Sequence, residues 1–212
     1  MNKLYLGIDS GSIYTKGVII DKYDNILVSS IVETKGEPIV SVKEMLNEMV
    51  SNIDFTENKI VAIGVIGVSR KLVGMLLDAD LIVDDVKANL TAIKKEIPNV
   101  KTVIEIGGEH AKLLRVNADG EDSVIVSNSC LVETGSFLNW LVKKMNLNID
   151  DVSKLVKKSK NDVMLMGKCG VFLETEITQK LKDGYHKEDI LVAVSKMIAI
   201  NYFNNVIKSK KN

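Results

Sequence analysis

Two cysteines, Cys130 and Cys169, are the only ones in this 212-residue chain, and they offer its most distinctive chemistry. Each precedes a segment whose apolar residues recur at helical spacing. These residues are Phe137, Leu138, Leu141, Val142 and Met145 after the first cysteine, and Val171, Phe172, Ile177 and Leu181 after the second. A sulfur near a helix N-terminus is favoured as the thiolate, which is the form that binds metal.

One pair of thiolates cannot complete a four-thiolate site, whereas a two-fold dimer would supply four. We therefore expect a metal site that two copies share across a dimer axis, and an iron–sulfur cluster fits thiolate-only ligation as well as zinc does. The alternative is a pair of buried cysteines that bind nothing, which is common in cytosolic proteins.

The segment from Asp9 to Lys16 combines residue types that hold a phosphate. Gly11 at the tip of a hairpin lets backbone N–H groups approach a phosphate closely. Ser12 and Thr15 can add hydroxyl donors, and Lys16 adds a positive charge. Asp9, at the end of a strand, can hold Mg²⁺ through water. The alternative is an ordinary glycine–serine hairpin without a ligand.

A second glycine turn, Gly107-Gly108, repeats the order strand, glycine turn, strand, turn, strand that opens the chain. Glu105 before this turn would mirror Asp9 before the first. An internal duplication of this kind predicts two similar domains with a nucleotide in the cleft between them. The strands of the second set are expected at residues 100–106, 111–116 and 123–126.

The elements that must position the first hairpin form a recognisable order. Alternating apolar residues predict an antiparallel meander of three strands, followed by helices that alternate with strands. A nearly uninterrupted apolar run predicts that the strand at 60–67 is covered on both faces. This is the order of a ribonuclease-H-like α/β domain. The expected strands are 4–8, 15–21, 26–34, 60–67 and 81–83, and the expected helices are 38–52, a short one from Arg70, and 85–97.

The composition indicates a soluble globular protein. Apolar residues make up 46% of the chain, charged residues 26%, and the formal net charge is zero. No overall field recruits nucleic acid or an anionic membrane, so we expect neither as a partner. No signal peptide or membrane-length apolar run is seen, which favours the cytoplasm. Pro98 marks a boundary between a first domain, 1–98, and a second, 99–212, which carries both cysteines.

Four motifs then carry a resemblance to a known family. The chain resembles the ATP-dependent activator components of 2-hydroxyacyl-CoA dehydratases, in the BadF/BadG/BcrA/BcrD ATPase family. The resemblance implies an α/β fold with two ribonuclease-H-like domains of the actin type. The motifs are Leu-Gly-Ile-Asp-Ser-Gly-Ser-Ile-Tyr-Thr-Lys at 6–16, Ile-Glu-Ile-Gly-Gly-Glu-His-Ala-Lys at 104–112, Cys-Leu-Val-Glu-Thr-Gly-Ser-Phe-Leu at 130–138 and Gly-Lys-Cys-Gly-Val-Phe-Leu-Glu-Thr-Glu at 167–176.

The resemblance also implies an activity and its cofactors, ATP, Mg²⁺ and a [4Fe–4S] cluster. Cys130 and Cys169 of both subunits would ligate one cluster at a homodimer interface. Asp9 and Glu105 would be the catalytic acids. ATP binding and hydrolysis would drive an electron from the cluster into a dehydratase-like partner. The residues expected to bind the nucleotide are Gly11, Ser12, Thr15, Lys16, Gly107, Gly108, Glu109, Thr134 and Gly135.

Three departures from the family pattern bear on this expectation. His110 stands where the family has aspartate, which predicts slow or lost hydrolysis. Val132-Glu133 replaces a small Ala-Gly pair. The chain ends at Asn212, before the strand and glycine-rich loop that grip adenosine, so we expect a C-terminally incomplete second domain and weak nucleotide affinity. The rival functions are a small-molecule kinase of the same superfamily and a regulatory domain that has lost ATP turnover.

Overall fold

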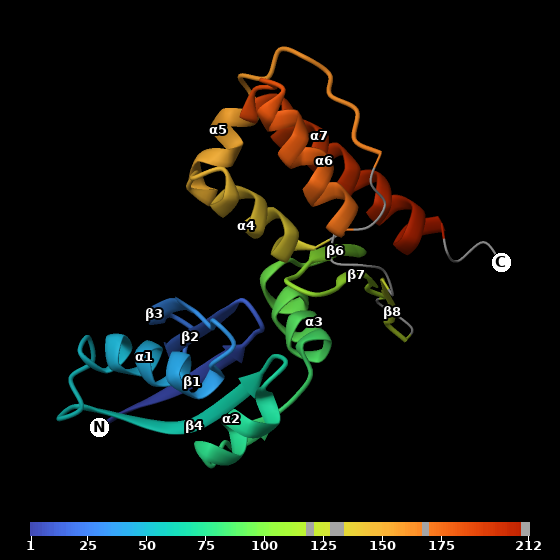
Figure 1. Cartoon of the computed structure of the whole chain (residues 1–212). Coiled ribbons are helices and arrows are strands. Elements are labelled where there is room, and N and C mark those ends of the chain that lie inside the picture. The colour runs from blue at the N-terminus through green and yellow to red at the C-terminus, as the bar shows by residue number, and fades with distance from the viewer. Residues whose placement is uncertain (118–120, 128–133, 167–169, 209–212) are drawn as a thin grey trace. The chain divides into compact units, whose positions relative to one another are not determined.

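The computed structural model describes residues 1–117, 121–127, 134–166 and 170–208. The chain divides into two compact units, Met1–Asn99 and Val100–Asn212. Both combine a sheet with helices, so the predicted α/β class is confirmed (Figure 1).

The first unit is built around a five-stranded sheet with the order β3-β2-β1-β4-β5. Strands β1 to β3 form the predicted antiparallel meander, and β4 joins β1 in parallel. The bounds agree with the sequence prediction to within a few residues. The elements are β1 (Asn2–Ser10), β2 (Tyr14–Asp21), β3 (Ile26–Glu33), α1 (Pro38–Val50), β4 (Asn58–Ile66), α2 (Arg70–Leu76), β5 (Leu81–Ile82) and α3 (Asp85–Glu96).

The core of the first unit lies between one face of this sheet and helices α1 and α2. Leu4, Leu6 and Ile8 of β1 alternate toward this face, as the strand period of two requires. The apolar side chains Val42, Met45, Met49 and Val73 of the two helices pack against them.

Strand β4 is not covered on both faces, and that prediction was wrong. Val65 is fully buried, but Val61 is 38% exposed. Both α1 and α2 pack into the core on the same face of the sheet, and helix α3 contributes no buried residue. The apolar run therefore reflects β propensity more than complete burial.

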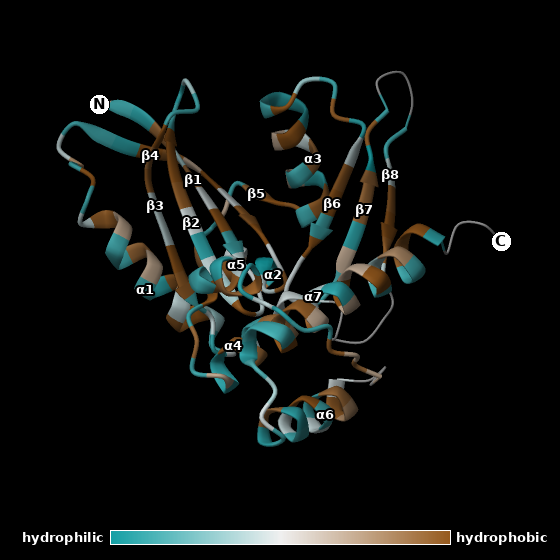
Figure 2. Cartoon of the chain, turned by 90° about the horizontal axis from the view of Figure 1, so that it is seen from above, coloured by the Kyte–Doolittle hydropathy of each residue, from teal (hydrophilic) through white to brown (hydrophobic). Residues whose placement is uncertain are grey.

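The second unit has a three-stranded antiparallel sheet, β6-β7-β8, and a layer of helices. In Figure 2 its strands and helices carry both hydrophobic and hydrophilic residues. Its elements are β6 (Thr102–Ile106), β7 (Ala111–Arg115), β8 (Ser123–Val126), α4 (Gly135–Lys144), a 3₁₀ turn η2 (Ile149–Asp151), α5 (Val152–Val156), α6 (Gly170–Lys182), α7 (Lys187–Tyr202) and a π-helical turn η3 (Phe203–Ile207).

Two apolar clusters hold the second unit together. The larger joins α4, α6 and α7, and a smaller one places the end of α7 and η3 against β7. The predicted apolar face of α4 is confirmed, but that of α6 is partly wrong. Leu173 and Ile177 are fully buried, whereas Val171 and Phe172 are 70% and 72% exposed. Residues four apart share a helix face, and the buried pair defines a face that excludes the other two.

The helix from Lys187 to Ile207 is the one described segment that is long and apolar enough to cross a membrane. Its apolar residues are largely used inside the unit. Ile190, Leu191, Val194 and Ile198 lie in the core that α7 shares with α4 and α6. The apolar character of this helix is thus accounted for by packing within the second unit.

Asp189, in the first turn of α7, is buried and fixes the loop that follows α5. Its carboxylate accepts hydrogen bonds from the Ser159 hydroxyl at 2.8 Å, the Lys160 N–H at 2.9 Å, and the backbone and side-chain amides of Asn161. The hydrogen bonds from Asn161, then those from Ser159 and Lys160, hold the pKa of Asp189 well below its ordinary value of 3.8.

Because the pKa of Asp189 is lowered in the folded protein, the free energy of unfolding depends on pH. The contribution of Asp189 is fully present above about pH 4 and is lost as the pH falls through the lower, folded-state pKa. We expect Asp189→Asn to melt below the wild type at pH 7, and the gap to narrow on acidification. Thermal unfolding at several pH values measures this. A gap that stays constant down to strongly acidic pH would contradict it.

Candidate functional site

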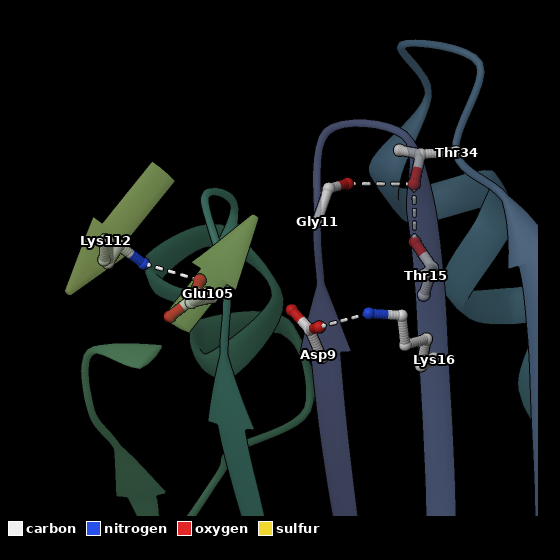
Figure 3. Close-up of polar contacts among 7 residues, drawn as sticks. All are labelled: Asp9, Gly11, Thr15, Lys16, Thr34, Glu105 and Lys112. Carbon is white, nitrogen blue, oxygen red and sulfur yellow. Dashed lines mark hydrogen bonds and ion pairs between the residues drawn. The ribbon is translucent and has the colours of Figure 1, made fainter. Parts of the chain in front are cut away.

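The first hairpin places Asp9 and Lys16 opposite each other on β1 and β2. The Lys16 Nζ lies 3.1 Å from the Asp9 Oδ2, and their side chains are 52% and 30% exposed (Figure 3). The Gly11 N–H donates to the Tyr14 carbonyl at 3.1 Å and closes the turn. The carboxylate and the ammonium group are therefore both accessible next to a tight glycine turn.

Thr15 lies in the same hairpin but is directed into the protein. Its hydroxyl is fully buried, 3.0 Å from the Thr34 Oγ1 and 2.8 Å from the Ser41 Oγ. Thr34 also contacts the Gly11 carbonyl, and Ser41 the Pro38 carbonyl. The Thr15 hydroxyl is therefore enclosed by Thr34 and Ser41 and helps to shape the hairpin. This geometry does not fit the predicted role of its hydroxyl as a phosphate donor.

Gly67, just after β4, comes close to the same carboxylate and was missed by the sequence analysis. Its φ of +98° is in the left-handed region. A Cβ here would lie 2.4 Å from the Ser10 carbonyl oxygen and 2.8 Å from the Asp9 Oδ1. The Ser69 N–H donates to the Ser10 carbonyl at 3.2 Å. Only glycine allows the backbone to pass this close to the end of β1.

The second hairpin repeats this arrangement on β6 and β7. The Lys112 Nζ lies 3.0 Å from the Glu105 Oε1 across the strand pair, and the Gly107 N–H donates to the His110 carbonyl at 2.9 Å. The side chains of Lys112 and Glu105 are 9% and 24% exposed, so this ion pair is better shielded than the first (Figure 3).

The two hairpins match position by position. In each, a glycine follows the acid by two residues, and the lysine follows the acid by seven. In each, the glycine N–H donates to the carbonyl three residues later. His110 therefore contributes a backbone carbonyl at the position that Tyr14 holds in the first hairpin. The closure of the turn uses only the backbone of His110 and does not involve its imidazole.

Thr134 and Gly135 are brought to the second hairpin at the start of α4. The Gly135 N–H donates to the Gly107 carbonyl at 2.8 Å, and the neighbouring Ser136 hydroxyl donates to the Gly108 carbonyl. Thr134 is buried at the N-cap of α4. A helix N-terminus beside a glycine turn is a favourable place for an anion.

The remaining predicted site residues are Ser12, Glu109 and the two cysteines. Ser12 is half-buried beside Gly11 at the tip of the first hairpin, and Glu109 is exposed in the second turn. Cys130 and Cys169 lie outside the described residues. Within the described ranges, no three His, Cys, Asp or Glu side chains come together as a metal site.

Both units thus carry a hairpin with the same acid, glycine and lysine spacing. Over residues 6–211 the sequence matches the BadF/BadG/BcrA/BcrD ATPase family. The chain belongs to this family. A relative in Clostridioides difficile, the 2-hydroxyisocaproyl-CoA dehydratase activator, is 25% identical over 195 residues, which cover 92% of this chain and 72% of the relative.

Solved structures of this family show the same fold. Component A of the (R)-2-hydroxyglutaryl-CoA dehydratase from Acidaminococcus fermentans superposes with a TM-score of 0.80 at 25% identity, covering 95% of this chain and 77% of the other. The activator of the 2-hydroxyisocaproyl-CoA dehydratase from Clostridium difficile, with bound ADPNP, superposes with a TM-score of 0.82 at 23% identity. That superposition covers 99% of this chain and 78% of the other.

Proposed function

We propose that this chain is the ATPase module of an activator that delivers an electron to a 2-hydroxyacyl-CoA dehydratase-like partner. ATP with Mg²⁺ would bind at the two hairpins, and its hydrolysis would drive the transfer. The observation that carries the proposal is the repeated hairpin, in which an acid, a glycine and a lysine recur at the same spacing. Family membership and the ADPNP bound by a structural relative support it.

Each hairpin can contribute distinct chemistry to such a reaction. The glycine turns expose backbone N–H groups to phosphate oxygens, and Lys16 can leave Asp9 to meet negative charge because half of its side chain is exposed. Asp9 and Glu105 would be the carboxylates that hold Mg²⁺ through its water ligands. Lys112 is shielded and stays with Glu105.

We also propose ribonuclease-H-like domains for both units. The first unit has the order of three antiparallel strands, helix, strand, helix, strand, helix, and the second unit repeats its three-stranded start.

Cys130 and Cys169 are the two thiolates that the chain can offer to a [4Fe–4S] cluster. The chain has only these two cysteines, so a thiolate centre would depend on them. Two copies together supply the four ligands that such a cluster needs, so a homodimer is part of the proposal. The bound cluster would supply one-electron redox chemistry. A soluble, cytoplasmic protein that binds neither nucleic acid nor membrane completes the proposal.

Anaerobic purification tests the proposal directly. We expect brown protein with about four iron and four sulfide per dimer. Cys130→Ser and Cys169→Ser should each lose the colour and the iron, because in a homodimer each substitution removes two of the four thiolates around the shared centre. Iron and sulfide analysis, absorbance and dimer mass by light scattering measure this.

Two results would contradict the proposal. Colourless wild-type protein with zinc in place of iron would remove the electron-transfer role. Serine variants that keep full iron content would show that the metal is held elsewhere. Circular dichroism of each variant serves as the control, because a folded variant without iron reports ligand loss and not unfolding.

A further inference from the structure

A cavity of about 610 Å³ lies in the second unit, between the loop that follows α5 and the start of α7. Its volume is within the range of about 300–1,000 Å³ that is typical of sites for small molecules. None of its lining residues belongs to either hairpin. The charged and titratable residues of the lining are Lys157, Lys158, Lys160, His186, Glu188 and Asp189.

The three lysines of this lining, called the cavity lysines below, carry positive charge that no acid neutralises. Among the described residues, no carboxylate lies within ion-pair distance of their Nζ atoms. Two other lysines of the same unit are paired. The Lys154 Nζ lies 3.5 Å from the Asp151 Oδ1, and the Lys196 Nζ lies 2.6 Å from the Asp162 Oδ1. The cavity lysines are therefore available to an anion from solution.

The two acids of the lining differ in how they affect this charge. The Asp189 carboxylate is only 2% exposed and is occupied by hydrogen bonds from Ser159, Lys160 and Asn161. Two of these bonds come from backbone N–H groups, so Asp189 fixes the course of the loop that carries the cavity lysines. A loop that is already ordered loses less entropy when it binds a ligand. Glu188 is the lining carboxylate that remains to repel an anion.

We propose that this cavity binds a small molecule that carries phosphate groups. Three lysines within four residues match the several negative charges of a diphosphate, and each ammonium group offers three donors to phosphate oxygens. A cavity of this volume holds a compact ligand, whereas an acidic peptide would lie along an extended surface. The inference is independent of the proposed function, because it uses neither hairpin and neither cysteine.

The two histidines of the chain give separate signals for this cavity and for the second hairpin. His186 lines the cavity, His110 lies in the hairpin, and both are exposed. Proton NMR of the full chain without a histidine tag resolves their Cε1–H signals, which His110→Gln and His186→Gln assign. We expect pyrophosphate, added without Mg²⁺ at constant pH, to shift the His186 signal until it saturates. Inorganic phosphate should bind more weakly because it carries fewer charges.

ADP distinguishes an inorganic ligand from an organic one. If ADP saturates the His186 shift at a lower concentration than pyrophosphate does, the cavity takes an organic diphosphate. If pyrophosphate saturates it first, the ligand is an inorganic one. His110 reports any binding of ADP at the second hairpin in the same titration.

Substitutions of opposite sign test whether the lining itself makes the site. Lys157→Gln, Lys158→Gln and Lys160→Gln should each weaken pyrophosphate binding up to about fivefold, the range of an exposed charge pair. The triple variant should weaken it up to about 10²-fold. Glu188→Gln should instead strengthen binding, because it removes the repelling carboxylate.

A second triple variant is the matched control. Lys59→Gln with Lys87→Gln and Lys101→Gln removes the same total charge from exposed lysines that do not line the cavity. Its His186 titration should match the wild type within about twofold, because charges in water are screened over about 10 Å at 0.1 M salt.

Several results would overturn the proposal. These are a His186 signal that does not move in millimolar pyrophosphate, equal weakening in the two triple variants, and weaker binding by Glu188→Gln. A hexaglutamate peptide that saturates the His186 shift before pyrophosphate would assign the cavity to a protein partner instead. A shift of His110 alone would place the anion at the hairpin, which overturns the cavity site and supports the proposed function.

Discussion

Replacing Glu105 with glutamine is expected to lower ATP turnover by about 10²–10⁴-fold, the range typical for removal of a group that handles a proton or orients water. Glutamine keeps the shape of the side chain but not its charge. The same change leaves the Lys112 ammonium, 9% exposed, facing a neutral amide. Breaking a shielded ion pair from one side costs about 3 kcal/mol of unfolding free energy. Steady-state ATPase assays and urea unfolding measure the two effects.

A double variant separates catalysis from stability. Glu105→Gln with Lys112→Met removes both charges, so most of the lost stability should return while turnover stays low. Asp162→Asn is the control, because the Lys196–Asp162 pair is exposed at both ends and should contribute less than about 1 kcal/mol. Recovery of turnover in the double variant would show that Glu105 serves only to neutralise Lys112.

Replacing Gly67 with alanine is expected to destabilise the first unit by at least about 3 kcal/mol. Two costs combine here. The φ of +98° disfavours any residue with a Cβ, and that Cβ would lie 2.4 Å from the Ser10 carbonyl oxygen. Relief of the clash moves the end of β1 and with it Asp9, so nucleotide binding should weaken as well. Urea unfolding and Mg·ADPNP binding test this.

Gly36→Ala provides the matched control. Its φ of +75° is also left-handed, but nothing lies within 4 Å of the added Cβ. The backbone cost alone is about 1–2 kcal/mol. Equal losses at the two glycines would mean that the close approach of Gly67 to β1 contributes nothing.

Much of the fold was predictable because it depends on local sequence patterns. The meander of β1 to β3, helix α1 and the hairpin of β6 and β7 follow from apolar spacing and glycine turns, which need no distant partner. The matched pairs Asp9–Lys16 and Glu105–Lys112 follow from the same logic, since a tight turn fixes which residues lie opposite each other.

Contacts between distant segments could not be predicted in this way. The inward direction of Thr15 depends on Thr34, which directly follows β3, and on Ser41 of α1. The approach of Gly67 to Ser10 requires the parallel register of β4 on β1. The bond from Tyr202 to the hairpin spans 90 residues. A glycine directly after an apolar strand is the one local signal that could have pointed to Gly67.

The first strands of the two sheets differ in how many strands they pair with, and this difference affects the tendency of the protein to self-associate. Strand β1 is flanked by β2 and β4, whereas β6, its counterpart in the second hairpin, has β7 as its only neighbour among the described strands. Ile104 and Ile106 on β6 are 59% and 47% exposed. Among the described strands, β6 is thus an edge strand with exposed apolar side chains, and such a strand favours sheet extension between molecules. Self-association should therefore grow with protein concentration, and dilute samples give the cleanest unfolding data.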